Sequence, residues 1–79
     1  MNNNEKYVQI FMEIFSLGEN EVNEETTMEN IELWDSVGHV NLVATVEDTF
    51  GVEMTIDEMS EFTSFEAGKG ILRKYGVDI

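Results

Sequence analysis

The chain has 79 residues and a net charge of −13, with 17 acidic residues, four basic residues and no cysteine. This length predicts a single domain, residues 1–79, whose modest core is most economically built from locally packed helices. The absence of cysteine excludes disulfides and thiolate metal sites. A surface this acidic disfavours binding to nucleic acid and to anionic membranes.

The basic residues stand near the two ends of the sequence. No lysine or arginine lies between Tyr7 and Gly68, where His39 is the one potential cation. This one-sided acidity favours attraction to partner proteins with basic patches, and acidity that serves solubility alone is the alternative. No signal peptide and no segment long enough to span a bilayer is visible. We therefore expect a cytoplasmic monomer without membrane insertion.

The first predicted elements are a helix and a long acidic connection. Apolar residues at three- and four-residue spacing predict a helix from Asn3 to Ser16, ended by Gly18 in the left-handed conformation. The connection that follows extends to Asp35. We expect it to be ordered and laid across the helices, with a helical turn near Met28–Ile31. Its apolar anchors are Val22, Met28, Ile31, Leu33 and Trp34.

The second predicted helix runs from Ser36 to Phe50 and ends at Gly51, with Asp35 and Ser36 as good helix starters. With a turn of about 100° per residue, one side of it faces the core. That side carries His39, Leu42, Val43, Val46 and Phe50. The opposite side is apolar in its first turns and acidic only further along, which is typical of a docking surface unless another segment covers it. It carries Ser36, Val37, Val40, Asn41, Ala44, Glu47 and Asp48.

Two further helices complete the prediction. A short one runs from Asp57 to Phe62, with Thr55 or Asp57 as its cap, and the last runs from Ser64 to Tyr75 and ends at Gly76. Thr63 is expected to cap the last helix, with Glu66 completing a capping box. The expected inward residues of that helix are Phe65, Gly68, Ile71, Leu72 and Tyr75. The predicted fold class is therefore all-α, a four-helix bundle with three longer helices, a short third helix and a long loop between the first two.

The start of the second helix offers two kinds of chemistry. A hydrolytic set of Asp35, Ser36 and His39 would need an oxyanion loop, which the sequence does not supply, and the helical sorting places His39 on the core side. Ser36 could instead hold a phosphate-containing group, because a helix start presents unpaired amides. Gly38 costs roughly 1 kcal/mol against alanine inside a helix, which indicates a close approach there. An ordinary helix cap is the simpler interpretation of Ser36. No EF-hand pattern is present, and we expect no metal site.

The helix carries a series of motifs: Asp35-Ser36-Val37, Val40, Leu42-Val43, Val46-Glu47-Asp48 and Phe50-Gly51-Val52. This series resembles the acyl carrier protein family, whose signature is Asp-Ser-Leu/Ile-x-x-Val/Met-x-Leu followed by an apolar and acidic helix. The resemblance extends over nearly the whole chain in the order of its helices. It implies that Ser36 carries 4′-phosphopantetheine through a phosphodiester, with an acyl or aminoacyl group as a thioester on the terminal thiol. It also implies that the chain is not an enzyme and presents its cargo to partner enzymes.

The resemblance assigns roles to the neighbours of Ser36. Asp35 would take part in recognition by the phosphopantetheinyl transferase that loads the arm. Loading ligases or synthases and acyltransferases would contact Val37, Val40, Asn41, Ala44, Glu47 and Asp48. Carriers of general fatty acid synthesis usually have acids where this chain has Gly38 and Asn41, and a bulkier residue in place of Ala44.

These departures, with Trp34 and the Gly38-His39 pair, are more similar to stand-alone carriers of specialised pathways, such as polyketide, aminoacyl or surface-polymer biosynthesis. The alternative function is an acidic protein–protein interaction module without a prosthetic group. In such a module Ser36 could be replaced freely.

Overall fold

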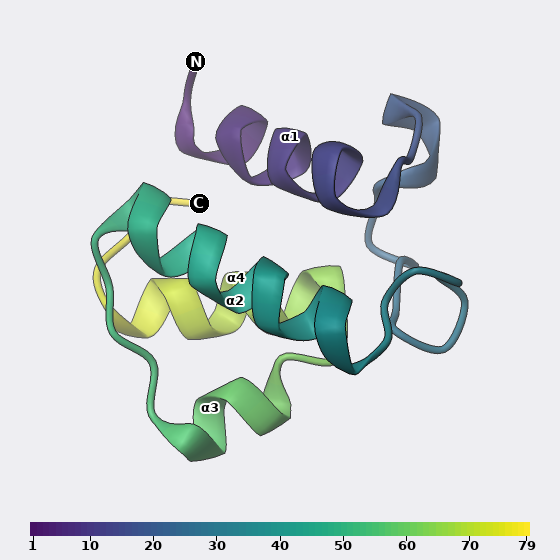
Figure 1. The fold of residues 1–79 in the computed structure, drawn as a ribbon. Helices are drawn as coiled ribbons and strands as arrows, with labels where there is room; N and C mark the ends of the chain where they lie inside the picture. Colours follow the sequence, from purple (N-terminus) through teal and green to yellow (C-terminus); the bar gives the residue numbers. More distant parts are fainter.

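The structure is a computed structural model that describes all residues, 1–79. It contains four α-helices: α1 (Asn3–Phe15), α2 (Ser36–Phe50), α3 (Ile56–Glu61) and α4 (Phe65–Lys74). Their arrangement is shown in Figure 1, where α1 lies along one side of α2 and α3 lies on the other. There are no strands. The prediction of a helical chain with three longer helices and a short third one is confirmed, and no helix has both the length and the hydropathy needed to cross a bilayer.

The start of α1 is capped, but its end differs from the prediction. The Asn2 side chain accepts a hydrogen bond from the Glu5 amide at 2.8 Å, and the Glu5 carboxylate accepts one from the Asn2 amide at 3.4 Å. The residue in the left-handed conformation after the helix is Ser16 (φ 54°) and not Gly18, so that expectation was wrong. Gly18 has φ −79°, because its amide donates to the Glu21 carboxylate at 2.8 Å and opens the short 3₁₀ turn η1 (Glu19–Glu21).

The long connection between α1 and α2 is ordered by its own hydrogen bonds and by contact with the start of α4. The buried Thr26 hydroxyl donates to the Glu21 carbonyl at 2.8 Å, and the Thr26 carbonyl accepts from the Phe65 amide at 2.9 Å. An isolated bridge joins Thr27 to Ser64. Thus segments nearly forty residues apart in sequence are tied together, and the connection does not need a helix to be rigid.

Three of the five predicted anchors of the connection point inward. Val22 and Trp34 are buried and Ile31 is partly buried, whereas the side chains of Met28 and Leu33 are 37% and 48% exposed. The predicted helical turn near Met28–Ile31 is a single hydrogen-bonded turn, in which the Asn30 amide donates to the Thr27 carbonyl at 3.1 Å.

The cap of α3 is one of the two predicted residues, and the cap of α4 lies one residue after the predicted one. Thr55 caps α3, and a capping box with Glu58 starts the helix at Ile56 rather than at Asp57. Ser64 caps α4 by accepting from the Ala67 amide at 2.9 Å, so the predicted box of Thr63 with Glu66 is absent. The Thr63 carbonyl accepts from the Met28 amide at 3.0 Å, which ties this residue to the long connection.

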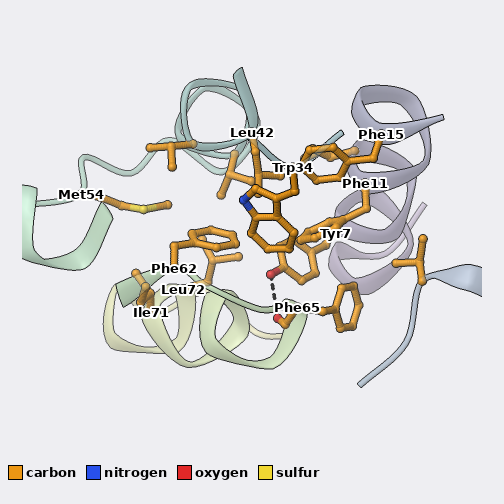
Figure 2. Packing of buried hydrophobic residues seen from close by; sticks show 14 residues of the cluster. Tyr7, Phe11, Phe15, Trp34, Leu42, Met54, Phe62, Phe65, Ile71 and Leu72 are labelled. Carbon is orange, nitrogen blue, oxygen red and sulfur yellow. Dashed lines mark hydrogen bonds between the residues drawn. The ribbon is translucent and has the colours of Figure 1, made fainter. Parts of the chain in front are cut away.

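Aromatic side chains dominate the single hydrophobic cluster (Figure 2). The Tyr7 hydroxyl donates to the Phe65 carbonyl at 2.8 Å, and burial, with a smaller contribution from Glu66, raises the pKa of that hydroxyl above its usual range. From α2 the predicted core residues Leu42, Val43 and Val46 are buried, whereas His39 and Phe50 are only partly so. The expected inward residue Tyr75 is 38% exposed and bonds to Glu58 instead.

Trp34 stands at the centre of this cluster in Figure 2. Its ring stacks on Phe15 with centroids 5.1 Å apart and meets the ring of Phe11 edge-on at 5.5 Å. Phe62, which links α3 to α4, lies on another side of the indole at 6.3 Å. The end of the long connection is therefore packed against residues from α1 and from the α3–α4 junction.

Two glycines of α4 provide a test of this packing. A Cβ on Gly68 would collide with the Tyr7 hydroxyl and the Phe62 ring, whereas a Cβ on Gly70 meets nothing within 4 Å. We expect Gly70→Ala to stabilise the fold by about 1 kcal/mol, because alanine is the better helix former. Gly68→Ala should destabilise it, because overpacking costs about 1–3 kcal/mol and outweighs that gain.

Thermal unfolding followed by circular dichroism measures both changes. At this chain length 1 kcal/mol corresponds to a shift in Tm of about 4–8 °C. Gly70→Ala is the matched control, since it makes the same substitution two residues away in the same helix. An equal rise in Tm for both variants would contradict the close packing of α4 against Tyr7 and Phe62.

Candidate functional site

The junction Trp34–Asp35–Ser36 divides three roles among three consecutive residues. Trp34 is 3% exposed, in the core. Asp35 is the N-cap of α2, and its Oδ1 accepts a hydrogen bond from the Gly38 amide at 2.8 Å. Ser36 is the first helical residue. The interpretation of Ser36 as the helix cap is therefore wrong, because the preceding aspartate performs that role.

Ser36 is exposed, and its hydroxyl takes part in none of the hydrogen bonds of the chain. At the start of a helix the first amides have no partner within the helix. Here Asp35 satisfies the Gly38 amide, which leaves those of Ser36 and Val37 without a partner. The site therefore combines a free hydroxyl with the positive end of the helix dipole, a combination suited to a phosphate ester. One oxygen of Asp35 is used in capping, and the other remains available beside the serine.

The structure explains why glycine occupies position 38, which the sequence did not reveal. It is buried, and a Cβ there would collide with the Leu33 carbonyl oxygen and lie 3.2 Å from the Phe15 ring. The close approach indicated by this glycine is therefore made by the chain itself. Trp34, Gly38, Leu42 and Val46 follow one another at four-residue intervals, a spacing that could have placed Gly38 on the inner stripe.

The outward face of α2 is uncovered. Val37 and Val40 are 70% and 66% exposed, and Asn41, Ala44 and Asp48 are exposed as well. The alternative in which the long connection covers this face is wrong. Val37 and Val40 are three residues apart on one helix and therefore neighbours, so together they form a small apolar patch that begins beside Ser36.

The two acids of this face differ. Glu47 is partly buried, and its Oε2 accepts from the Met54 amide at 2.8 Å, so it also holds the link between α2 and α3. Asp48 is exposed. The one ion pair of the chain joins Lys74 to Glu58 at 3.6 Å, so neither acid of α2 is neutralised by a lysine or arginine.

His39 is engaged away from Ser36. Its Nδ1 accepts from the Trp34 indole at 3.0 Å, and its Nε2 lies 2.8 Å from the Met59 carbonyl oxygen. Asp35 in turn is bonded to the Gly38 amide. The three residues Asp35, Ser36 and His39 therefore do not form the hydrogen-bonded series that a hydrolytic triad requires.

A small apolar groove lies between α2 and α3. Its volume is about 170 Å³, and its lining residues are His39, Val40, Val43, Ala44, Glu47 and Met59. Sequence reasoning missed Met59, since a six-residue helix gives too few turns to assign a face. No three His, Cys, Asp or Glu side chains gather in the chain as a ligand set for a metal ion.

The sequence was compared with models of known families and with curated proteins. No family model matches the chain. No curated protein matches it either. The assignment of a function to this chain therefore depends on the residues and geometry described above and on the resemblance of its motifs.

The capping role of Asp35 predicts how substitutions affect stability. Asp35→Ala should lower the free energy of unfolding by about 1 kcal/mol, because the Gly38 amide loses its acceptor. Asp35→Asn should keep most of the stability, since the amide oxygen can accept the same bond. Urea unfolding measures both. Equal stability of the alanine variant and the wild type would contradict the cap.

Proposed function

We propose that the protein is a carrier of the acyl carrier type, with 4′-phosphopantetheine attached to Ser36 Oγ through a phosphodiester. When bound, the arm supplies a thiol that holds an acyl or aminoacyl cargo as a thioester. The four helices then act as a bundle that keeps the first turn of α2 at the surface. The chain performs no chemistry on the cargo, and its role is presentation to partner enzymes.

The observation that carries this proposal is the free, exposed hydroxyl of Ser36 at the first position of α2. A serine that served as a cap would have its oxygen engaged by a backbone amide, and here Asp35 occupies that position instead. The unengaged hydroxyl and the neighbouring amides fit a phosphodiester without any rearrangement of the helix. The free oxygen of Asp35 supports a role in recognition by the phosphopantetheinyl transferase, where it could hold the metal ion used in transfer.

The uncovered face of α2 supports docking of the partner enzymes beside Ser36. Val37, Val40, Asn41 and Ala44 offer an apolar and uncharged contact, and Glu47 with Asp48 offers the acidic one. The presence of Gly38 and Asn41 where carriers of general fatty acid synthesis usually have acids favours a specialised polyketide, aminoacyl or surface-polymer pathway over general fatty acid synthesis. The apolar groove between α2 and α3, with a volume of about 170 Å³, supports contact with a short apolar part of a cargo.

Intact-protein mass spectrometry tests the attachment. After co-expression with a phosphopantetheinyl transferase, the wild-type protein should gain the mass of the arm. Ser36→Ala should gain nothing while keeping its helical circular dichroism, because the Ser36 hydroxyl has no structural bond to lose. Asp35→Asn keeps the cap but removes the negative charge. It should therefore keep its fold and be loaded about tenfold more slowly.

An unmodified wild-type protein in that assay would contradict the proposal. The rival function, an acidic interaction module without a prosthetic group, predicts that outcome. It also predicts binding that depends on salt and on net charge, whether or not Ser36 is replaced.

The outward face of α2, the proposed docking face, gives a second test. Val40→Ala and Asp48→Lys should each reduce the rate of loading about five- to tenfold, a change that corresponds to about 1–1.4 kcal/mol of lost contact. Both side chains are exposed, so the circular dichroism should not change. Glu24→Lys is the control, because it makes the same charge change at an exposed position of the long connection. Equal slowing by Glu24→Lys would show that net charge, and not this face, controls docking.

A further inference from the structure

His39 joins three separate parts of the chain. It lies in the first turns of α2, its Nδ1 is bonded to the indole of Trp34 at the end of the long connection, and its Nε2 is bonded to the carbonyl of Met59 in α3. The His39 ring is nearly parallel to the Trp34 ring and edge-on to that of Phe62. Neither the attachment of the arm nor the docking face makes use of this arrangement.

The two partners dictate the protonation state of the imidazole. The indole N–H is only a donor, so Nδ1 must be a bare acceptor, and the Met59 carbonyl is only an acceptor, so Nε2 must carry the hydrogen. This is the neutral Nε2–H form. A proton added to Nδ1 would place two donors 3.0 Å apart and leave the buried Trp34 indole without a partner.

α3 depends on such polar contacts more than the other helices do. It has six residues and none of them is buried, although Met54 before it and Phe62 after it are. Besides the partial packing of Met59 on the core, two polar contacts hold the helix itself: the bond from His39 to the Met59 carbonyl, and Glu58, which accepts from the Tyr75 hydroxyl and pairs with Lys74. An element with little buried surface opens at low cost, so one contact has a large effect on it.

We propose that His39 is a positioning residue that clamps α3 and Trp34 to α2 in its neutral form, and that protonation of Nδ1 opens the clamp and the groove between α2 and α3. The proposal does not depend on the attachment of an arm to Ser36. Its consequence is a proton-sensitive position of Met59, which lines the groove together with Val40 and Ala44 of the docking face.

The charged groups around the imidazole do not replace its partners. On α2, Asp35 lies one turn earlier and caps the helix, and Glu47 lines the same groove while bonding to the Met54 amide. On α3, Glu58 precedes Met59. None of these acids forms an ion pair with His39. The Thr55 amide, followed by the Tyr75 hydroxyl, lowers the pKa of Glu58, so its contribution to stability is lost only as the pH falls below the range in which histidine titrates.

Nuclear magnetic resonance of the full chain tests the proposal, because the chain has one histidine and one tryptophan. At about pH 8, imidazole ¹⁵N shifts should show His39 as the Nε2–H tautomer. Between about pH 8 and about pH 5.5, where most carboxylates stay ionised, the Trp34 indole signal should move with the His39 ring signals. Over the same range the protection of α3 amides against exchange, corrected for the intrinsic pH dependence of the exchange rate, should fall about five- to tenfold, as the loss of one hydrogen bond predicts.

His39→Gln is the matched variant, since glutamine keeps a donor and an acceptor but does not titrate. In this variant the indole signal and the corrected protection of α3 amides should not change over that pH range, while the corrected protection of α1 amides should be alike in the wild type and the variant. An Nδ1–H tautomer at pH 8, or an indole and α3 response that is absent in the wild type or persists in the variant, would overturn the proposal. If the variant does not fold, the wild-type tautomer and the joint pH response decide the question alone.

Discussion

The packing of Trp34 beneath the first turn of α2 is the constraint on which the site depends. The indole lies between the rings of α1 and Phe62, and the backbone of Leu33 comes so close to α2 that only glycine fits at position 38. Because successive residues of a helix turn by about 100°, the inward packing of Gly38 against Leu33 and Phe15 fixes which residues of the first turn point outward. Asp35 then reaches the free amides, and Ser36 is left outside. The exposure of the serine is therefore a consequence of the burial of the tryptophan.

The same junction explains why an aspartate precedes the serine. A serine with a small or apolar residue before it would itself be drawn into capping, since its oxygen is a good acceptor for the free amides. Asp35 removes that competition by bonding the Gly38 amide. Its negative charge is favourable at this end of the helix dipole, so the cap is stable without any help from Ser36. Asp35 thus stabilises the start of the helix, and Ser36 is left free for the proposed attachment.

The sequence predicted the helices well and their ends less well. α2 was predicted to its last residue, because a strong apolar stripe lies between a good cap and a glycine with φ 65°. At Ser16 the backbone amide donates to the Met12 carbonyl of the same helix. The errors at Gly18, Thr63 and Ser64 share another cause, because each of these residues contacts a residue of the long connection: Glu21, Met28 and Thr27, respectively. Local propensity does not contain such contacts.

The candidate site shows the same limit. Sequence pattern placed the outward face of α2 correctly, because helical periodicity decides which residues share a face. It did not reveal that Gly38 is needed for internal packing, or that Glu47 holds Met54. Both depend on segments outside the helix, Leu33 on one side and the link to α3 on the other.

The distribution of charge along α2 separates two steps of partner binding. After the capping residue Asp35, the first turns of α2 are uncharged, and the exposed acid Asp48 lies twelve residues beyond Ser36, about 18 Å along the helix axis. That distance exceeds the Debye length of about 8 Å at physiological ionic strength, so Asp48 hardly influences the charges of a partner positioned at the serine. The acid acts on the approach of a basic partner, which mainly changes the rate of association. Apart from Asp35, the contact at the serine is then left to Val37, Val40 and the shape of the groove, which are sensitive to the fit of the partner rather than to its charge.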